Sequence, residues 1–394
     1  MHMNEGIGDT VSLTSVTIIS PEAANGRNVV ALGVVTALAS IKKTAVFRPA
    51  VCRKDTFTDI LLEASNAGLT REQSVGVCPR HAREDKAGSR ADIVAAYTEA
   101  IEAAQPEAVV IVGTDKSPVN DPALFAFNAD VAADLKAPVL LAVCTINRTP
   151  EQVRFTVEAS TATIEAAGTK VVGVFITGCK DDQPEALHAE FADYPVPVWT
   201  LPAVDFSEEG AVAKASEAFS FNVDTADLLA AIDAPFEVPT TPYAFQYSLL
   251  GKAKADRKTI VLPEGEEDRI IKAADYLLER DVVDLIILGD ENAILARGEE
   301  LGLKSLSKAK FQAMDDEEVL TPMVAKLCEL RAKKGMTEDQ ARKQLTDASY
   351  FGTMLVVLGL ADGLVSGSVN STANTVRPAL QVIKTKPGTS LVSG

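Results

Sequence analysis

The residues best suited to chemistry lie near the end of the sequence. A run of small hydroxyl and amide residues at 366–374 leads into an amphipathic segment that continues to residue 384. We expect this segment to be a helix with Arg377 and Pro378 in its first turn, where proline is tolerated because the N–H groups have no intrahelical partner. Unpaired N–H groups, the positive end of the helix dipole and a guanidinium together suit a phosphate. The stretch therefore predicts a phosphate site.

Three kinds of group would form this site: backbone N–H groups of the loop, hydroxyl groups and one guanidinium. The side chains concerned are Ser368, Ser371, Thr372 and Arg377. The alternative is an ordinary strand-to-helix turn whose hydroxyls cap the helix, and such turns are common.

Two further arginines are candidates for binding anions. Arg269 follows an expected strand, and ligands of parallel sheets bind at the carboxyl ends of the strands. Its alternative is an exposed arginine on a helix, paired with Glu266 or a neighbouring carboxylate. Arg331 lies just before Gly335, and its own pattern favours a basic last helical turn, which the helix dipole stabilises.

Residues 19–28 stand where a P-loop would stand, between a strand and a helix. A P-loop ends in Gly-Lys-Ser/Thr, and its lysine reaches the phosphates while its hydroxyl holds Mg²⁺. The triplet here is Gly26, Arg27 and Asn28, and the earlier glycines are missing. The stretch predicts a degenerate P-loop with a structural role, and a residual nucleotide site is the alternative.

Composition excludes several other classes of function. The 394 residues include 38 Lys and Arg against 55 Asp and Glu, a net charge of −17, which serves solubility and disfavours nucleic acids and anionic membranes. Five scattered cysteines without a CxxC pair and three separated histidines favour reduced thiols and no metal site. No apolar run reaches about 18 residues. We therefore expect a cytoplasmic protein.

The first part alternates β-branched apolar runs with amphipathic segments, a pattern that predicts an α/β fold with a parallel sheet covered by helices. The expected strands are 16–20, 44–51, 108–113, 138–143, 170–178 and 196–202, and the expected helices 28–41, 90–104, 122–136 and 151–167. Pro197 demotes the last strand towards an edge. Residues 1–231 form the predicted first domain, and the proline-rich residues 232–250 the linker.

The pattern restarts in the second predicted domain, residues 251–394. We expect strands at 259–263, 284–289 and 360–366, and helices at 264–280 and at 322–334 before Gly335. Thr337 and Gln340 match a capping box that begins another helix. Residues 390–394 read as the start of a strand, so we expect the sequence to stop inside a domain.

Long motifs of the second domain carry a family resemblance. They are LPEGEEDR at 262–269, ELRAKKGM at 329–336, DGLVSGSVNSTANTVRP at 362–378 and LQVIKT at 380–385. They closely resemble bacterial phosphate acetyltransferase. Residues 13–225 resemble the dethiobiotin-synthetase-like, P-loop-derived domain that precedes the catalytic domain in long members of that family.

The resemblance implies a P-loop-like three-layer domain followed by a two-lobed, isocitrate-dehydrogenase-like acyltransferase domain. It implies the reversible reaction of acetyl-CoA with phosphate to give acetyl phosphate and CoA, by direct attack in a ternary complex. No metal or cofactor is implied, since coenzyme A is a substrate, and the family is usually oligomeric. Arg269, Arg331 and Arg377 match arginines implicated in CoA and phosphate binding, and the loop with Ser368, Ser371, Thr372 and Asn374 borders the same cleft.

Two departures from the family accompany the resemblance. Asn370 stands where relatives often carry His. The family's catalytic Asp, with its neighbouring Ser and Arg, lies in a continuation beyond the position of Gly394, so the second lobe is expected to be missing. Two alternatives stay open: phosphate butyryltransferase, which differs in acyl length, and a non-catalytic regulatory or binding protein.

Overall fold

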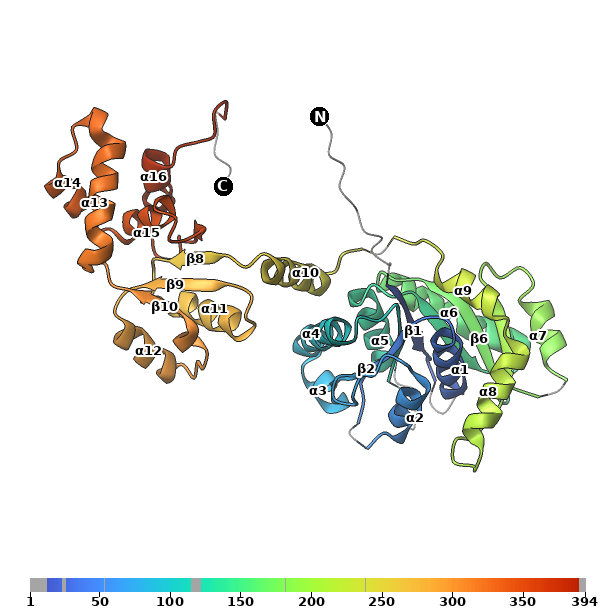
Figure 1. Ribbon diagram of the computed structural model, residues 1–394. Helices are drawn as coiled ribbons and strands as arrows, with labels where there is room; N and C mark the ends of the chain where they lie inside the picture. The colour runs from blue at the N-terminus through green and yellow to red at the C-terminus, as the bar shows by residue number, and fades with distance from the viewer. Residues whose placement is uncertain are drawn as a thin grey trace. The chain divides into compact units, whose positions relative to one another are not determined.

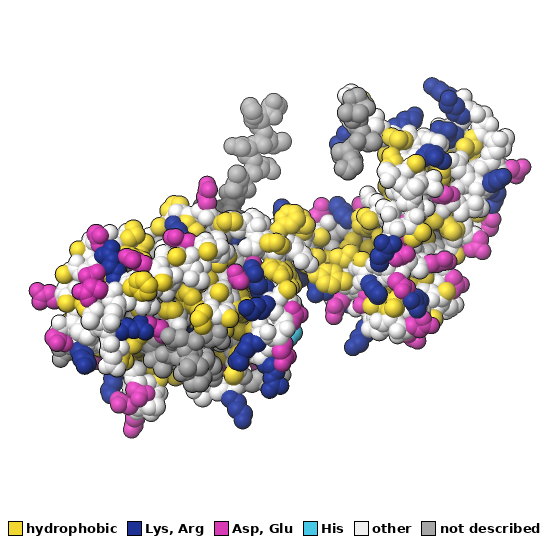
Figure 2. Space-filling view, turned by 180° about the vertical axis from the view of Figure 1, so that it is seen from behind, with side chains coloured by type: hydrophobic (Ala, Val, Ile, Leu, Met, Phe, Trp, Pro, Cys, Tyr) yellow, Lys and Arg dark blue, Asp and Glu magenta, His cyan; other side chains and the backbone are white. Residues whose placement is uncertain are grey.

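The computed structural model describes residues 13–22, 26–52, 54–114, 122–180, 182–237 and 239–389. These divide into two compact units, Met1–Tyr247 and Ser248–Gly394, each an α/β unit with its own sheet (Figure 1). Figure 2 shows acidic and basic side chains interspersed on the visible face of each unit, so the net negative charge is not gathered there in one patch. Among the described helices, none is both long and apolar enough to cross a membrane.

The first unit is built on a seven-stranded parallel sheet with the order β3-β2-β4-β1-β5-β6-β7. Its strands are β1 (Thr14–Ile19), β2 (Thr44–Ala50), β3 (Val75–Val77), β4 (Ala108–Val112), β5 (Val139–Cys144), β6 (Val171–Cys179) and β7 (Val198–Pro202). The six predicted strands are all present, and β7 lies at an edge as Pro197 indicated. The missed β3 is three residues long and contains a glycine, too little for an apolar pattern.

Nine described helices cover both faces of this sheet. They are α1 (Arg27–Ala39), α2 (Thr56–Ala64), α3 (Pro79–Glu84), α4 (Lys86–Ala104), α5 (Pro122–Asp134), α6 (Pro150–Ala166), α7 (Pro184–Glu190), α8 (Ala211–Asn222) and α9 (Thr225–Ile232). Helices α1, α2, α8 and α9 share one apolar core with the sheet, and α3 to α7 pack on the other face. Residues of β5 alternate between the two cores, which is why the strand reads as a continuous apolar run. The predicted three-layer domain is confirmed.

Helix α10 (Pro242–Ala255) begins inside the predicted linker. Its Tyr243 and Tyr247 pack against the core of the first unit, and the Arg90 guanidinium lies 5.0 Å from the centre of the Tyr243 ring. The boundary between the units, after Tyr247, therefore falls within a helix rather than within extended chain.

The second unit has a four-stranded parallel sheet with the order β10-β9-β8-β11. The strands are β8 (Thr259–Leu262), β9 (Asp284–Leu288), β10 (Lys310–Gln312) and β11 (Gly363–Leu364). Helices α11 (Asp268–Glu279) and α12 (Glu291–Glu300), with the 3₁₀ turn Leu306–Lys308, cover one face. The other face carries α13 (Glu317–Arg331), α14 (Glu338–Gln344), α15 (Ala348–Val357) and α16 (Thr372–Val382) (Figure 1). A second 3₁₀ turn, Ala332–Lys334, follows α13 and ends at Gly335, whose φ is 69°.

Prolines misled the prediction of two helix starts. Helix α13 begins at Glu317, so Pro322 lies inside it, although we expected the helix to start there. Helix α16 begins at Thr372, so Arg377 and Pro378 lie beyond the first turn, and that prediction was wrong. In both helices a side chain five or more residues before the proline, Asp316 or Ser371, caps the N-terminus and so fixes the start.

Two other boundaries differ for one shared reason. The predicted strand 360–366 is reduced to Gly363–Leu364, and the predicted helix 264–280 starts only at Asp268. The residues missing from the strand and from the helix are irregular where the two segments meet: the Glu264 carboxylate of one accepts hydrogen bonds from the N–H groups of Gly367 and Ser368 in the other. The predicted capping box of Thr337 and Gln340 is confirmed.

Candidate functional site

The Gly/Ser loop that follows β11 is organised by one carboxylate, that of Glu264. Its Oε2 accepts hydrogen bonds from the N–H groups of Gly367 and Ser368, at 3.1 and 2.9 Å. Its Oε1 accepts from the N–H groups of Val369 and Asn370, both at 2.8 Å, and from the Asn370 side-chain amide at 3.0 Å. Four successive backbone N–H groups thus converge on one side chain.

This arrangement corrects the predicted phosphate site. The backbone N–H groups expected to hold phosphate are already bound to Glu264, which is only 8% exposed. Burial alone would raise the pKa of Glu264, but the four N–H donors lower it, and the net result is a pKa below the ordinary value. The loop can therefore receive an external anion at these N–H groups only if Glu264 leaves them.

Arg269, the second residue of α11, reaches the same loop from the other side. Its Nη2 donates to the carbonyl oxygen of Ser368 at 3.0 Å, and its Nε donates to Glu267 at 2.6 Å. The pairing with a neighbouring carboxylate matches the alternative given above for this arginine. The contact with Ser368 nevertheless brings two of the predicted site residues together at the carboxyl end of β8, with 70% of the Arg269 side chain exposed.

The start of α16 carries the other loop residues. The Ser371 hydroxyl accepts from the N–H of Asn374 at 3.3 Å and is therefore a helix cap. Thr372 and Asn374 are exposed in the first turn. Arg377 is exposed in the second turn, and no hydrogen bond or ion pair of the described residues engages its guanidinium. It remains a cation available to a ligand.

Arg331 closes α13, as its pattern indicated. Helix α13 packs against α16 in a shared apolar core. The Nε of Arg331 is buried without a hydrogen-bond partner, and no hydrogen bond or ion pair between described residues joins Arg331 to Arg269 or to the Gly/Ser loop. The structure thus links Arg269, but not Arg331, to the loop by a hydrogen bond.

Sequence reasoning missed Glu264, the residue with most contacts to the loop. A signal was present, because an acidic residue followed by Gly265 stands directly after a buried strand, where side chains of parallel sheets meet their ligands. What the pattern could not give was the partner, which lies more than a hundred residues later in the chain.

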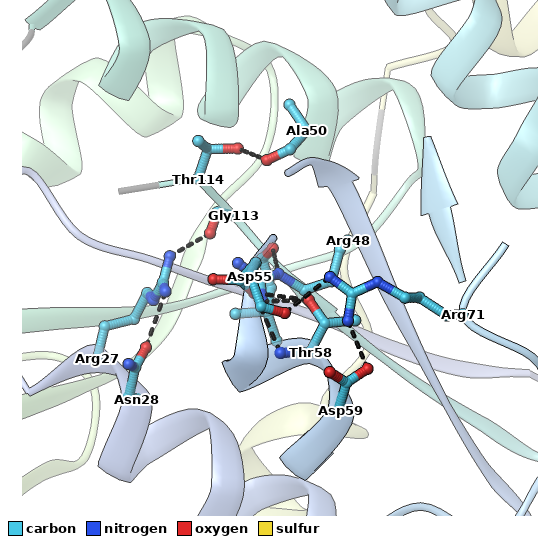
Figure 3. A network of polar contacts seen from close by, with 11 residues as sticks. Arg27, Asn28, Arg48, Ala50, Asp55, Thr58, Asp59, Arg71, Gly113 and Thr114 are labelled. Atoms are coloured by element: carbon cyan, nitrogen blue, oxygen red, sulfur yellow. Dashed lines mark hydrogen bonds and ion pairs between the residues drawn. The ribbon is translucent and has the colours of Figure 1, made fainter. Parts of the chain in front are cut away.

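In the first unit, the degenerate P-loop is closed by its own arginine. Gly26 precedes α1 with a φ of 74°, and no side chain caps the helix. Arg27 stands where a P-loop has its lysine, but it is 2% exposed. Its guanidinium donates to the carbonyl oxygen of Gly113 and, at 2.8 Å, to Asn28 Oδ1 (Figure 3). Within the stretch 19–28, residues 23–25 lie outside the described residues.

A second buried arginine lies at the same edge of the sheet. Arg48, on β2, is 1% exposed, and its Nε donates to the carbonyl oxygen of Val112 at 3.1 Å. Its Nη1 binds Asp55 Oδ2 at 3.0 Å, and Asp55 also caps α2 by accepting from the N–H of Thr58 (Figure 3). Nearby, Arg71 pairs with Asp59 at the surface. Hydrogen bonds from the two buried arginines to backbone carbonyls thus join the strand ends, and the buried Arg48–Asp55 ion pair joins β2 to the start of α2.

A cavity of about 490 Å³ remains beside this network, lined by residues that follow β1, β5, β6 and β7. Arg27 and Asn28 form part of its wall, with Cys144 and Asp205 among the others. Within the described ranges, no group of three or more His, Cys, Asp or Glu side chains is arranged to hold a metal ion.

Two α/β units with parallel sheets, the second with Arg269 at the carboxyl end of β8, define a class of fold in which ligands bind at strand ends. Comparison with known families is more specific. Residues 244–394 match the model of the phosphate acetyl/butaryl transferase family, and residues 14–205 match that of an AAA domain. Each match covers less than half of the chain, and together the two matches confirm the predicted resemblance.

Curated relatives agree with this assignment. A phosphate acetyltransferase of Nitratidesulfovibrio vulgaris is 43% identical over 183 residues, which are 44% of this chain and 25% of the relative. One of Corynebacterium glutamicum is 46% identical over 149 residues, 38% of this chain and 45% of the relative. The chain thus spans less than half the length of these relatives. A phosphotransacetylase structure from Staphylococcus aureus is 44% identical, with a TM-score of 0.34, over 37% of this chain and 44% of that one.

The closed P-loop leads to a prediction about nucleotides. The first unit should not bind Mg-ATP by P-loop chemistry, because the phosphate-binding lysine and the Mg²⁺-binding hydroxyl are absent and the Arg27 guanidinium is buried against Gly113. Calorimetry at millimolar nucleotide should detect no saturable binding. Micromolar affinity that depends on Mg²⁺ would show that the arginine moves aside.

The buried ion pair leads to a prediction about stability. Asp55→Ala removes the carboxylate that pairs with the buried Arg48 guanidinium, and breaking a buried pair from one side should lower the free energy of unfolding by about 3–5 kcal/mol. The matched control is Asp59→Ala, since Asp59 is 58% exposed in its pair with Arg71, and loss of such a pair costs about 0.2–1 kcal/mol. Urea unfolding followed by tryptophan fluorescence of Trp199 reports on this unit. Equal effects of the two variants would contradict the prediction.

Proposed function

We propose that the protein carrying this chain is a phosphate acetyltransferase, which transfers an acetyl group reversibly between coenzyme A and inorganic phosphate. The observation that carries the proposal is the match of residues 244–394 to the phosphate acetyl/butaryl transferase family, in the same segment that holds Arg269, Arg331 and Arg377. The relatives named phosphate acetyltransferase support the acetyl group over the butyryl group. Acetyl-CoA, phosphate and acetyl phosphate are then the ligands.

The described residues can bind and orient these anions. Arg377 is exposed and no described residue pairs with its guanidinium, and Arg269 is held in place by two contacts while most of its side chain stays exposed. A planar guanidinium can bind two oxygens of one phosphate and so fix its orientation as well as its position. In the proposed reaction, arginines at the carboxyl end of β8 hold CoA or phosphate while the CoA thiolate attacks the acetyl carbon and phosphate leaves.

The remaining parts of the proposal come from the resemblance. In the family, the base that deprotonates the CoA thiol, and the Ser and Arg beside it, lie in a continuation beyond the position that corresponds to Gly394. The reaction needs no metal or cofactor in this proposal, because coenzyme A is itself a substrate. Homo-oligomeric assembly and a cytoplasmic location belong to the same proposal.

A direct assay tests the function. A polypeptide extended to the length of the relatives should form acetyl-CoA from acetyl phosphate and CoA, with a higher kcat/KM for acetyl phosphate than for butyryl phosphate. Purified residues 1–394 should form none, because the family's base is not among them. Preference for butyryl phosphate would favour the butyryltransferase alternative. Binding of CoA without turnover in the extended polypeptide would favour a non-catalytic protein, and turnover by residues 1–394 would contradict the assignment of the base.

Arg377 provides a sharper test of the site. In the extended polypeptide, Arg377→Ala should lower kcat/KM for CoA or phosphate roughly 10- to 150-fold, since a charge-assisted contact contributes about 1.5–3 kcal/mol. Arg377→Lys should restore only part of this loss, because an ammonium cannot bind two oxygens with a planar fork.

Arg342→Ala is the matched control for Arg377→Ala. Arg342 also lies on a helix of the second unit, but both of its terminal nitrogens bind Glu317, at 2.8 and 3.0 Å. Its loss should leave kcat/KM close to the wild-type value. If Arg377→Ala behaves like this control with both substrates, Arg377 has no role in binding.

A further inference from the structure

We propose that Glu264 is a positioning residue of this site: its carboxylate fixes the Gly/Ser loop so that the loop holds Arg269 in the orientation that binds substrate. The inference rests on the proposed function for the identity of the substrate. Its structural part, the chain of contacts from Glu264 through the loop to Arg269, stands on the geometry alone.

The first step is the orientation of the loop peptides by Glu264. Each carboxylate oxygen takes two successive N–H groups, those of Gly367 and Ser368 on Oε2 and those of Val369 and Asn370 on Oε1. An N–H and the carbonyl of the same peptide unit point in opposite directions because the unit is planar. Once the N–H of Val369 faces Glu264, the carbonyl of Ser368, in the same peptide unit, must face away from it.

The second step is the capture of Arg269 by that carbonyl. The Ser368 oxygen accepts from Arg269 Nη2 at 3.0 Å. With Nε bound to Glu267 at 2.6 Å, the guanidinium is held at two of its three nitrogens. No hydrogen bond or ion pair between described residues involves Arg269 Nη1, and 70% of the Arg269 side chain is exposed. Glu264 therefore determines, through one peptide unit, which edge of the Arg269 fork is offered to an anion.

The third step is the requirement for a carboxylate at residue 264. Five N–H donors from the loop converge on it, and only a group that accepts at both oxygens satisfies them. A glutamine of the same length would place an NH₂ donor against N–H groups. Glu264→Gln should therefore release the N–H groups bound to one of the two oxygens, loosen the Ser368 peptide unit and weaken the hold of its carbonyl on Arg269.

The matched control is Glu266→Gln. Glu266 lies two residues away in the same turn, is exposed, and makes no hydrogen bond or ion pair with described residues. The substitution removes the same charge from nearly the same place without touching the loop. Any effect that both variants share is an effect of net charge. The Glu264 charge also acts directly on Arg269, and its removal alone would favour an anion there, so weaker binding in Glu264→Gln only is an effect of the loop contacts.

The first measurement is made on the 394-residue chain without ligand. Hydrogen exchange at the amides of residues 367–370 should accelerate at least about tenfold in Glu264→Gln and stay unchanged in Glu266→Gln. Rotation of the Arg269 guanidinium, followed by NMR with labelled arginine, should be restricted in the wild type and faster in Glu264→Gln. Unchanged exchange or unchanged rotation in that variant would overturn the proposal. Should Glu264→Gln fail to fold, Glu264→Asp keeps the charge on a shorter side chain and should show the same changes in smaller measure.

The second measurement separates positioning from a purely structural role. In the polypeptide extended to the length of the relatives, coenzyme A is titrated by calorimetry into the wild type, Glu264→Gln, Arg269→Ala and the double variant. Glu264→Gln alone should weaken binding about tenfold, yet by less than about twofold once Arg269 is already alanine, because residues that act through one another are not additive. Additive losses, or no loss on Glu264→Gln, would overturn the positioning role. If the wild type itself does not bind coenzyme A, the proposed function fails, and the rotation of Arg269 still decides the structural part.

Discussion

The hydrogen bonds of one nearly buried carboxylate, that of Glu264, organise the loop that follows β11 in the second unit. A carboxylate out of water is costly unless hydrogen bonds replace its hydration, and Glu264 obtains five of them from the residues that follow β11. Strand β11 ends after two residues, and the chain turns at Gly367 with a φ of 118°, where these hydrogen bonds begin. The course of the loop follows from this one interaction, whereas Glu267 caps α11 and Ser371 caps α16.

The two units use internal charges at their strand ends in different ways. In the first unit, Arg27 and Arg48 are almost fully buried, and their guanidinium groups bind backbone carbonyls and Asp55. In the second unit the buried charge is the carboxylate, and Arg269 and Arg377 are exposed. An arginine that is already bound within the protein has little left for a ligand. This difference supports the proposal that an anionic substrate binds to the second unit, although both sheets present their carboxyl ends in the way that suits ligand binding.

Much of this architecture could be predicted from the sequence because it depends on local patterns. The strands of the first unit are buried on both faces and read as unbroken apolar runs, and Pro197 marked the edge strand correctly. Helix starts were predicted less well where a proline was given more weight than a cap: Asp316 and Ser371 determine where α13 and α16 begin, and the prolines lie further along. A capping side chain accepts hydrogen bonds from N–H groups that have no other partner, whereas a proline only lacks a backbone N–H of its own.

The part of the site that the sequence could not supply is a pairing between distant segments. The run of hydroxyl residues correctly indicated a loop with converging N–H groups before a helix, and those groups do bind an anion. The anion is a side chain of the protein itself, and nothing in the local pattern distinguishes an internal carboxylate from an external phosphate. The distinction comes only from the fold, because β8 and β11 are neighbours in the sheet, and their adjacent ends bring Glu264 beneath the loop. A loop rich in glycine and serine therefore indicates that an anion is bound, while the strand order determines whether the protein supplies it. Here it does, so the backbone of the loop is already occupied, and the proposed function assigns the binding of substrate to the arginines around the loop.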